Sequence, residues 1–257
     1  MKVNQIMSNK LHFMFMQLVD STGEHIQEVA KAIHELKKGN FILVYDADDR
    51  EGEADFIMAA EYVTPKAIQL MRQKGGGLIF LMIAADIARH IQLPFFADVL
   101  ASSEQEYPLF KELISNDIPY DARSSFSLSI NHRDTYTGIT DNDRSLTIKR
   151  FAELTNQIHT LDEKLARETF GNEFRSPGHV PICIASKSPL KERFGHTELS
   201  IALLTMAQMN PVAVGCEIMG DDGNALKKKD VKKYAQAHHL EFLDGEQVIR
   251  SWNNWLK

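Results

Sequence analysis

The sequence predicts an α+β protein in which helices cover a mixed sheet within one domain. Short apolar runs, typical of buried strands, are interspersed with longer segments of helical periodicity. The two kinds of segment do not follow the strict strand–helix–strand alternation of a parallel sheet. A chain of 257 residues is long enough for one large domain. We therefore assign residues 1–20 to an N-terminal extension and residues 21–257 to a single domain.

The first third of the chain contains three predicted strands flanked by helices. Ser21 and Glu24 have capping-box spacing and begin a helix that ends at Gly39. Apolar runs predict strands at 41–45, 56–60 and 78–84, and helices are expected at 66–74 and 86–92.

The rest of the chain is irregular at first and then again contains both predicted strands and predicted helices. Residues 94–123 show few clear patterns. Phe126, Leu128 and Ile130 alternate with serines, which predicts a half-exposed strand, and a second strand is expected over 134–140. Further strands are predicted at 180–185 and 211–219, and helices at 146–158, 197–209, 230–239 and 247–252.

Composition and charge exclude several classes of protein. The net charge of −6, without a basic block, argues against a nucleic-acid partner. The two cysteines lie in apolar runs, which favours a reducing compartment, so we expect a cytoplasmic protein. The apolar stretch at 11–19 is too short for a membrane span and lacks a signal-peptide cleavage pattern, so no membrane association is expected.

The acidic loop at 46–55 is the most unusual stretch. It holds six carboxylates and one cation, Arg50, for a net charge of −5, and it lies between two predicted strands. Like charges this close repel, and a divalent cation together with Arg50 would relieve the repulsion. Glu51, Glu53 and Asp55 occupy alternate positions, which share one face of an extended segment. The alternative is a loop that keeps its carboxylates in water.

A second group of polar residues begins a predicted helix. Arg193, Gly195 and Thr197 lead into the apolar helix at 197–209. A helix N-terminus offers free N–H groups, glycine permits close approach of a ligand, and arginine adds a fork of donors, which together suit a phosphate. The alternative is a threonine-capped helix with a surface arginine.

Two further ionisable residues stand at ends of predicted strands. His179 precedes the strand at 180–185, where a lone loop histidine is either a surface residue or an acid or base. Glu217 interrupts an apolar strand, so its carboxylate is either exposed at the strand end or buried with a shifted pKa. Catalytic bases are found in the second situation.

Four motifs occur in order along the chain: D-D-R-E-G-E-A-D from 48, S-P-G-H-V-P from 176, R-F-G-H-T-E from 193 and C-E-I-M from 216. Together they resemble the family of 3,4-dihydroxy-2-butanone 4-phosphate synthases of riboflavin biosynthesis, and residues 137–144 resemble its archaeal, monofunctional type. The resemblance implies a lyase that converts ribulose 5-phosphate to 3,4-dihydroxy-2-butanone 4-phosphate and formate. It also implies a three-layer α/β/α sandwich, and a homodimer with active sites at the interface.

The resemblance further implies roles for individual residues. Glu51 and His196 match metal ligands, for Mg²⁺ or for Mn²⁺, which suits a histidine ligand as well. His179, Glu217 and Glu53 match catalytic positions. The positions that match substrate contacts are Arg50, Glu51, Asp55, Arg193, Gly195, His196, Thr197 and Glu217.

One position departs from the family pattern. Many members carry a cysteine in the strand after the glycine turn, where this chain has Phe80. We expect Phe80 to pack beside the site and to lower the rate modestly.

Two alternatives to the synthase remain. One is a metal-dependent sugar-phosphate isomerase, which would use the same enediolate chemistry without releasing formate. The other is a non-catalytic sugar-phosphate-binding relative.

Overall fold

One seven-stranded mixed sheet organises the fold, in a computed structural model that describes residues 23–257. The strands are β1 Ile42–Tyr45, β2 Ala54–Ala59, β3 Phe80–Ile83, β4 Phe126–His132, β5 Phe174–Ile184, β6 Val212–Glu217 and β7 Glu241–Asp244. Their order across the sheet is β4-β5-β3-β6-β2-β1-β7. The extension predicted for residues 1–20 and the cap predicted at Ser21 lie outside the described residues.

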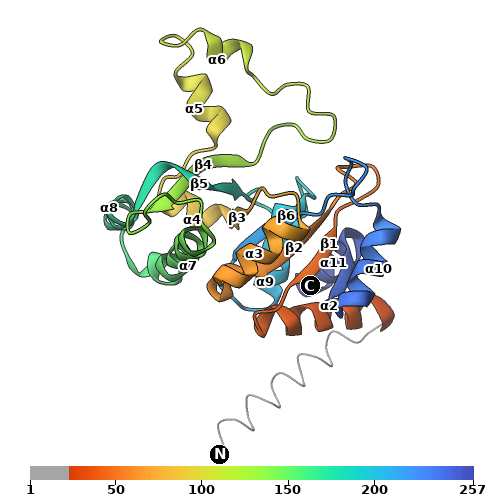
Figure 1. The fold of residues 1–257 in the computed structure, drawn as a ribbon. Helices are drawn as coiled ribbons and strands as arrows, with labels where there is room; N and C mark the ends of the chain where they lie inside the picture. The colour runs from red at the N-terminus through yellow and green to blue at the C-terminus, as the bar shows by residue number, and fades with distance from the viewer. Residues whose placement is uncertain (1–22) are drawn as a thin grey trace, which may run out of the picture.

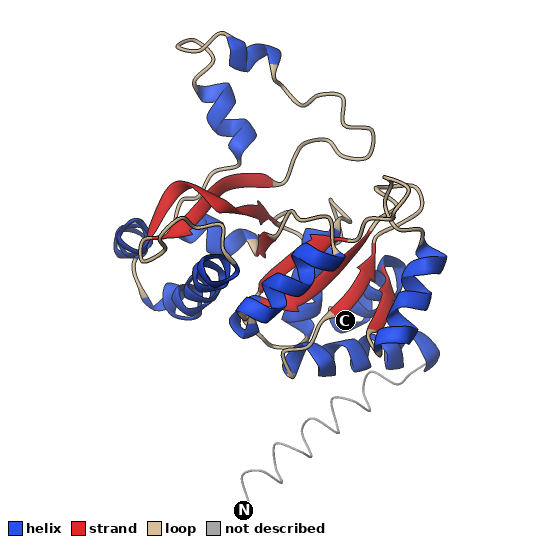
Figure 2. Ribbon diagram, viewed as in Figure 1, coloured by secondary structure: helices blue, strands red, loops and turns tan. Residues whose placement is uncertain are grey.

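Helices cover both faces of the sheet, which confirms the predicted α+β class (Figures 1 and 2). The α-helices of the described part are α2 Gly23–Lys37, α3 Pro65–Lys74, α4 Ala85–His90, α5 Phe96–Ser102, α6 Leu109–Glu112, α7 Asp141–Gln157, α8 Glu163–Glu173, α9 His196–Met206, α10 Lys228–His238 and α11 Gly245–Trp255. Helices α2, α9 and α11 contribute to one apolar cluster, and α3, α7 and α10 contribute to another on the opposite face. Within the described residues, no helix is long and apolar enough to cross a membrane.

The central strands are buried on both faces, which explains their nearly continuous apolar sequence. In β2, Phe56 and Met58 belong to the core beneath α3 and α7, whereas Ile57 and Ala59 belong to the core beneath α9. The same alternation places Asp55 of β2 on the α9 face. The polar residues of the acidic loop are thereby directed toward the start of α9.

The prediction of a strand at 134–140 is wrong. This segment forms turns that lead into α7, which begins at Asp141 rather than near 146. The side chain of Thr140 accepts a hydrogen bond from the backbone N–H of Asp143, and the Asp143 carboxylate accepts one from the N–H of Gly138 at 2.8 Å. Gly138 has a φ of +98°, which a strand does not allow. Local capping therefore prevails over the weak alternation of the sequence.

Three α-helices and one strand were not predicted. They are α5, α6 and α8, and the edge strand β7, which has only four residues. Figure 1 shows that the segment carrying α5 and α6 projects from the body of the protein. We call residues 94–125 the arm. Its two ends are held together where the Arg123 guanidinium lies 3.7 Å from the centre of the Phe95 ring.

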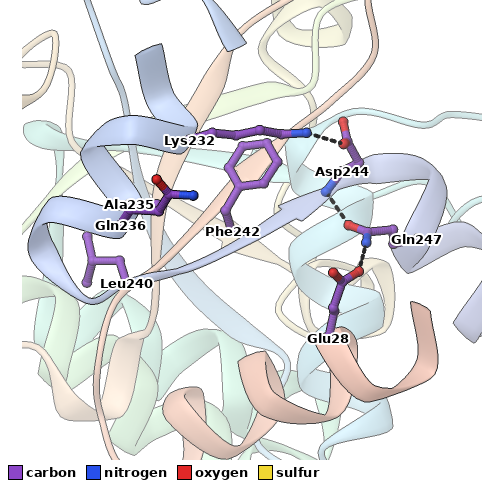
Figure 3. A pocket seen from close by; sticks show the side chains of 8 residues that line it. All are labelled: Glu28, Lys232, Ala235, Gln236, Leu240, Phe242, Asp244 and Gln247. Atoms are coloured by element: carbon purple, nitrogen blue, oxygen red, sulfur yellow. Dashed lines mark hydrogen bonds and ion pairs between the residues drawn. The ribbon is translucent and has the colours of Figure 1, made fainter. Parts of the chain in front are cut away.

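The β7 edge of the sheet is joined to the helices on either side. A pocket of about 310 Å³ lies here between α2, α10 and α11 (Figure 3). The Gln247 side chain accepts a hydrogen bond from the Asp244 N–H at 2.7 Å and donates one to Glu28 of α2. This capping box fixes the start of α11 to the end of β7.

Two glycines provide a test of the packing between β4 and β5. A Cβ on Gly178 would lie 1.9 Å from the Ile130 carbonyl carbon, whereas a Cβ on Gly171, within α8, would have no heavy atom within 4 Å. We expect Gly178→Ala to lower the melting temperature, because rigid backbone has to move. Gly171→Ala should leave it unchanged or raise it slightly, since alanine favours helix by up to about 1 kcal/mol. Thermal unfolding followed by circular dichroism measures both, and equal behaviour of the two variants would contradict this close approach of β5 to β4.

Candidate functional site

The acidic loop connects β1 to β2. It lies at the end of the sheet where the last residues of β6 are found. Asp55 of β2 pairs in register with Glu217 of β6. Because Asp55, Gly215 and Glu217 share the α9 face, both carboxylates lie on the side from which His196 enters at the first residue of α9. Segments far apart in the sequence therefore meet at one place.

A buried carboxylate, Asp46, organises the loop. Its Oδ2 accepts hydrogen bonds from Arg50 Nη1 and from the Glu51 N–H, both at 3.0 Å. Its Oδ1 accepts one from the Glu53 N–H at 3.1 Å. Asp46 is only 4% exposed, and Gly52, with a φ of +69°, provides the turn between the two N–H donors. The sequence analysis missed Asp46, because nothing in the acidic run distinguishes it from its neighbours.

The outer side of the loop is held by the end of β1. The Tyr45 hydroxyl donates a hydrogen bond to Asp48 at 2.7 Å, and Lys228 Nζ lies 4.6 Å from the centre of the Tyr45 ring. Lys228 also pairs with Asp244 at 2.5 Å. Burial and the Asp48 hydrogen bond raise the pKa of Tyr45, so it acts here as a neutral donor.

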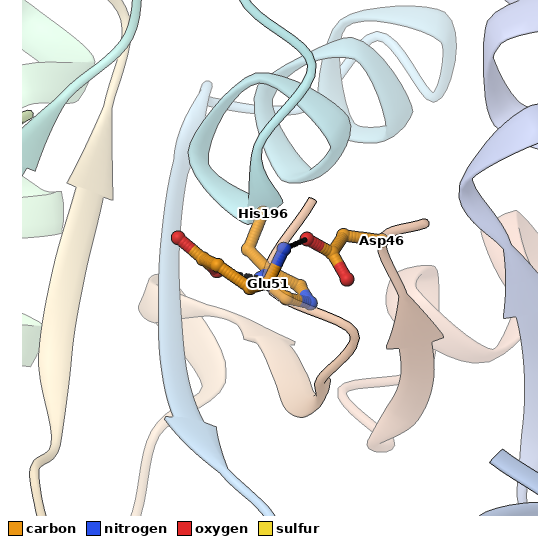
Figure 4. Close-up of side chains that lie close together, drawn as sticks. All are labelled: Asp46, Glu51 and His196. Carbon is orange, nitrogen blue, oxygen red and sulfur yellow. Dashed lines mark hydrogen bonds and ion pairs between the residues drawn. The ribbon is translucent and has the colours of Figure 1, made fainter. Parts of the chain in front are cut away.

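Glu51 and His196 form a close pair (Figure 4). His196 Nδ1 lies 3.2 Å from Glu51 Oε2, and the two side chains are 6% and 24% exposed. Burial raises the pKa of Glu51, but the hydrogen bond with His196 and the charge of Arg50 lower it to about 2. Burial lowers the pKa of His196, but the carboxylates of Asp55, Glu51 and Asp46 raise it overall.

These groups suit a divalent cation. One ligand atom each from Asp46, Glu51 and His196 lie within 4.8 Å of one another. Two backbone N–H groups fix the Asp46 carboxylate, whereas the Glu51 carboxylate pairs with the side chains of His196 and, at 3.0 Å, Arg50. Glu51 and His196 are therefore the groups better placed to turn toward a cation. Both oxygens of Asp55 and Nε2 of His196 are buried without a hydrogen-bond partner, although Asp55 Oδ1 and His196 Nε2 lie 3.7 Å apart as an ion pair. Buried polar atoms of this kind fit a site that binds a cation or a polar ligand.

Three carboxylates of the site share a raised pKa. Burial raises the pKa of Asp55, and the charges of Glu217 and Glu51 add to this effect. Burial is also the main cause for Glu217 and for Glu53, and neighbouring glutamates again contribute to the rise in their pKa. Glu217 lies between its two predicted alternatives, because its side chain is half-buried at the end of β6 and its pKa is raised. Carboxylates with a raised pKa hold a proton more readily than free ones, which suits proton transfer.

Two arginines converge on Gly195, at the start of α9. A Cβ on Gly195 would lie 2.6 Å from Arg193 Nη1 and 2.7 Å from Arg50 Nη2, so a larger residue would displace the guanidinium groups. Arg193 Nη1 donates to Glu198 at 2.5 Å, and Glu198 also accepts from the Ser186 N–H at 2.8 Å. Thr197 is buried in the same helical turn. The arginines and the helix N-terminus therefore form one cationic corner beside the acidic loop.

The arm contributes two residues to this corner that sequence analysis did not anticipate. Asp121 accepts hydrogen bonds from Arg193 Nε and, at 3.3 Å, from Arg50 Nη2. The Tyr120 ring centre lies 5.3 Å from the Arg50 guanidinium carbon. Both residues lie in an aperiodic stretch, and no local signal marks a contact with a residue 71 positions away.

His179 lies apart from the other candidates. It is on β5, and β3 and β6 lie between β5 and β2. Its N–H donates to Asn131 Oδ1 at 2.8 Å, and its Nδ1 lies 3.1 Å from Asn131 Nδ2. Asn131 Nδ2 also reaches the Thr137 carbonyl at 3.5 Å, and Gly138 packs against the same side chain. His179 thus belongs to a second polar cluster, around the start of α7.

Phe80 packs into the core beneath α9. It is 6% exposed and belongs to the same apolar cluster as Met82, Cys183 and Leu203. Its partner in the register is Gly215 of β6, two residues before Glu217.

Comparison with known proteins accounts for this arrangement. A 3,4-dihydroxy-2-butanone 4-phosphate synthase of Methanothermobacter thermautotrophicus is 44% identical over 228 residues, which cover 88% of this chain and 95% of the relative. The synthase of Archaeoglobus fulgidus is 40% identical over 232 residues, covering 90% and 96%. A solved structure of a synthase in complex with two magnesium ions superimposes with a TM-score of 0.65 at 25% identity, covering 85% of this chain and 93% of that one.

The sequence pattern of one family matches nearly the whole described chain. The match extends over residues 30–251 and includes the acidic loop, β5, α9 and β6. The chain belongs to the 3,4-dihydroxy-2-butanone 4-phosphate synthase family.

Proposed function

We propose that this protein converts D-ribulose 5-phosphate to 3,4-dihydroxy-2-butanone 4-phosphate and formate, a metal-assisted enolisation and rearrangement in riboflavin biosynthesis. The observation that carries the proposal is the union of three parts at one edge of the sheet. They are the Glu51–His196 pair, the buried carboxylates with raised pKa, and the cationic corner. Family membership and 44% identity to a named synthase support the same reaction.

Glu51 and His196 are the residues that would hold Mg²⁺ or Mn²⁺. A bound divalent cation supplies Lewis acidity and binding sites for sugar oxygens. Glu51 is ionised at neutral pH, because its pKa is about 2, and so offers the charge that a hard cation requires. Asp46 keeps Glu51 in place through the backbone N–H at 3.0 Å.

The remaining carboxylates are suited to proton transfer. Enolisation removes a proton from a carbon beside a carbonyl group, and a base with a pKa near the working pH does this best. Glu217 and Glu53 are the proposed bases, because both have a raised pKa yet are not fully buried. Asp55 is proposed to bind sugar hydroxyls with its unpartnered oxygens.

The cationic corner is proposed to bind the phosphate of the substrate. Arg193 offers its guanidinium fork, Gly195 leaves room for close approach, and Thr197 lies in the first turn of α9. Arg50 links this corner to the acidic loop through Asp46. The phosphate would thus be fixed at one end of the sugar while the reacting carbons lie over Glu51 and Glu217.

We also propose a cytoplasmic homodimer with the active sites at its interface. The reason is His179, which two strands separate from β2 within its own chain. A second copy of the chain would be needed to bring a His179 to the acidic loop. Next to its cluster, Tyr136 is 95% exposed and Ile139 is 50% exposed, which suits a protein contact. The His179 of a second copy would complete the proposed set of catalytic groups.

The direct test is incubation of the protein with ribulose 5-phosphate and Mg²⁺, followed by a formate assay. Formate together with the four-carbon phosphate supports the synthase. An aldose phosphate without formate would indicate an isomerase, and metal-dependent binding without turnover would indicate a non-catalytic relative.

Glu51→Gln should abolish metal-dependent turnover. The amide has nearly the same shape but lacks the charge that binds a hard cation. Formate release is measured over a range of Mg²⁺ concentrations, and Mn²⁺ binding is followed separately by its electron paramagnetic resonance signal. Glu61→Gln, at the other end of β2, is the matched control and should behave as wild type. Full activity of Glu51→Gln at the same Mg²⁺ concentration would remove Glu51 from the metal ligands.

Arg193→Ala should raise the KM for ribulose 5-phosphate by roughly ten- to a hundredfold, because a charge-assisted hydrogen bond contributes about 1.5–3 kcal/mol. Glu198 also loses its partner, so melting temperatures accompany the kinetics, and Arg193→Lys, which keeps the charge, should give an intermediate KM. Arg150→Ala, on the surface of α7, is the control. A normal KM in a folded Arg193→Ala protein would contradict the phosphate assignment.

His179→Gln should leave substrate binding nearly intact and lower kcat by about 10²–10⁴-fold, the usual contribution of proton transfer. Mixing this variant with Glu51→Gln tests the dimer. If each site takes Glu51 from one chain and His179 from the other, randomly mixed dimers should recover about a quarter of wild-type activity. Absence of recovery from exchanged subunits would assign both residues to the same chain, and an unchanged kcat would return His179 to a surface role.

A further inference from the structure

A carboxylate from the arm stands between the two arginines of the cationic corner. One oxygen of Asp121 accepts a hydrogen bond from Arg50 Nη2 at 3.3 Å and another from Arg193 Nε. The Asp121 side chain is only 11% exposed, although the arm around it projects from the protein. Asp121 therefore enters the corner from outside and closes part of it.

Neither arginine needs Asp121 to hold its position. Arg50 pairs with Asp46 at 3.0 Å, and Arg193 pairs with Glu198 at 2.5 Å. Both of these partners have side chains that are 0% exposed and are fixed by backbone N–H donors. Asp121 adds a further negative charge to guanidinium groups that are already paired, and it is more exposed than Asp46 and Glu198.

The place of Asp121 suits an oxyanion of a ligand. Its oxygen bridges two guanidinium groups, and both groups lie within 3 Å of the position that a Cβ of Gly195 would take. Fork-shaped donors next to a helix N-terminus are the typical surroundings of a phosphate. A phosphate dianion and the Asp121 carboxylate would repel each other strongly in this partly buried corner. The two anions therefore exclude each other.

We propose that Asp121 is an intramolecular competitor of phosphate, which occupies Arg50 and Arg193 until a phosphate group displaces it. The inference deepens the proposed function, since it rests on the assignment of these arginines to the substrate's phosphate. The return segment of the arm can withdraw without disturbing the core, because Leu113, Ile114 and Tyr120 are 53%, 52% and 44% exposed. The competitor favours ligands with a dianionic group over neutral sugars, which cannot displace a carboxylate from two arginines.

The test is calorimetric titration with inorganic phosphate, at constant ionic strength and without divalent cations. Asp121→Ala should bind phosphate roughly tenfold more tightly than wild type, since the ligand no longer displaces a charge-assisted contact. Asp121→Asn, which keeps the shape, should show part of this gain and serves if the alanine variant is poorly folded. Asp117→Ala is the matched control: it removes the same charge from an exposed position on the same segment and should match wild type.

Three results would overturn the proposal. The first is unchanged or weaker phosphate binding by folded Asp121→Ala and Asp121→Asn, and the second is an equal gain in Asp117→Ala. The third is undiminished phosphate binding when Arg193→Ala is combined with Asp121→Ala. A formate assay on the same proteins separates this inference from the proposed reaction. Tighter phosphate binding by Asp121→Ala without any formate from the wild type would support the competitor and reject the synthase. Formate release with unchanged phosphate affinity would do the opposite.

Discussion

The buried carboxylate of Asp46 is the constraint on which the site depends. A run of six carboxylates would normally spread into solvent, because like charges repel. Here two backbone N–H groups and the Arg50 guanidinium bind one carboxylate at 3.0–3.1 Å, and the chain folds back around it. Once Asp46 is fixed, Glu51 and Glu53 must leave the loop toward α9. The negative charge that looks unfavourable in the sequence thus becomes concentrated on the side chains that face His196.

The ionised groups of the site fall into two sets. Asp46 and Glu198 are fully paired with arginines and with backbone donors, so they serve the structure. Asp55 has two buried oxygens without a hydrogen-bond partner, and both Asp55 and Glu217 have a raised pKa. Burying the carboxylates of the second set costs free energy. That cost falls when a cation or a proton compensates their charge.

Sequence analysis predicted those parts of the fold that rest on burial. The runs that became β1, β2, β3 and β6 are apolar because these strands are covered on both faces. It failed where a few polar contacts decide the backbone, as between Gly138 and Asp143, where capping replaces a predicted strand. In the site, residue types and motifs identified Glu51, His196 and Glu217. Asp121 was out of reach, because its role depends on a contact across 71 positions that leaves no periodic trace.

The position of Phe80 is best understood through its neighbours in β6. Phe80 pairs with Gly215, and a Cβ there would lie 2.6 Å from the terminal methyl of Met82. Glycine thus leaves space on the α9 face for two large neighbours in β3, and the Phe80 ring fills part of that space as a core residue. At 6% exposure, the phenyl ring presents little surface outside this core. Since Glu217 lies two residues beyond Gly215 on the same face, the ring supports the strand that carries this carboxylate.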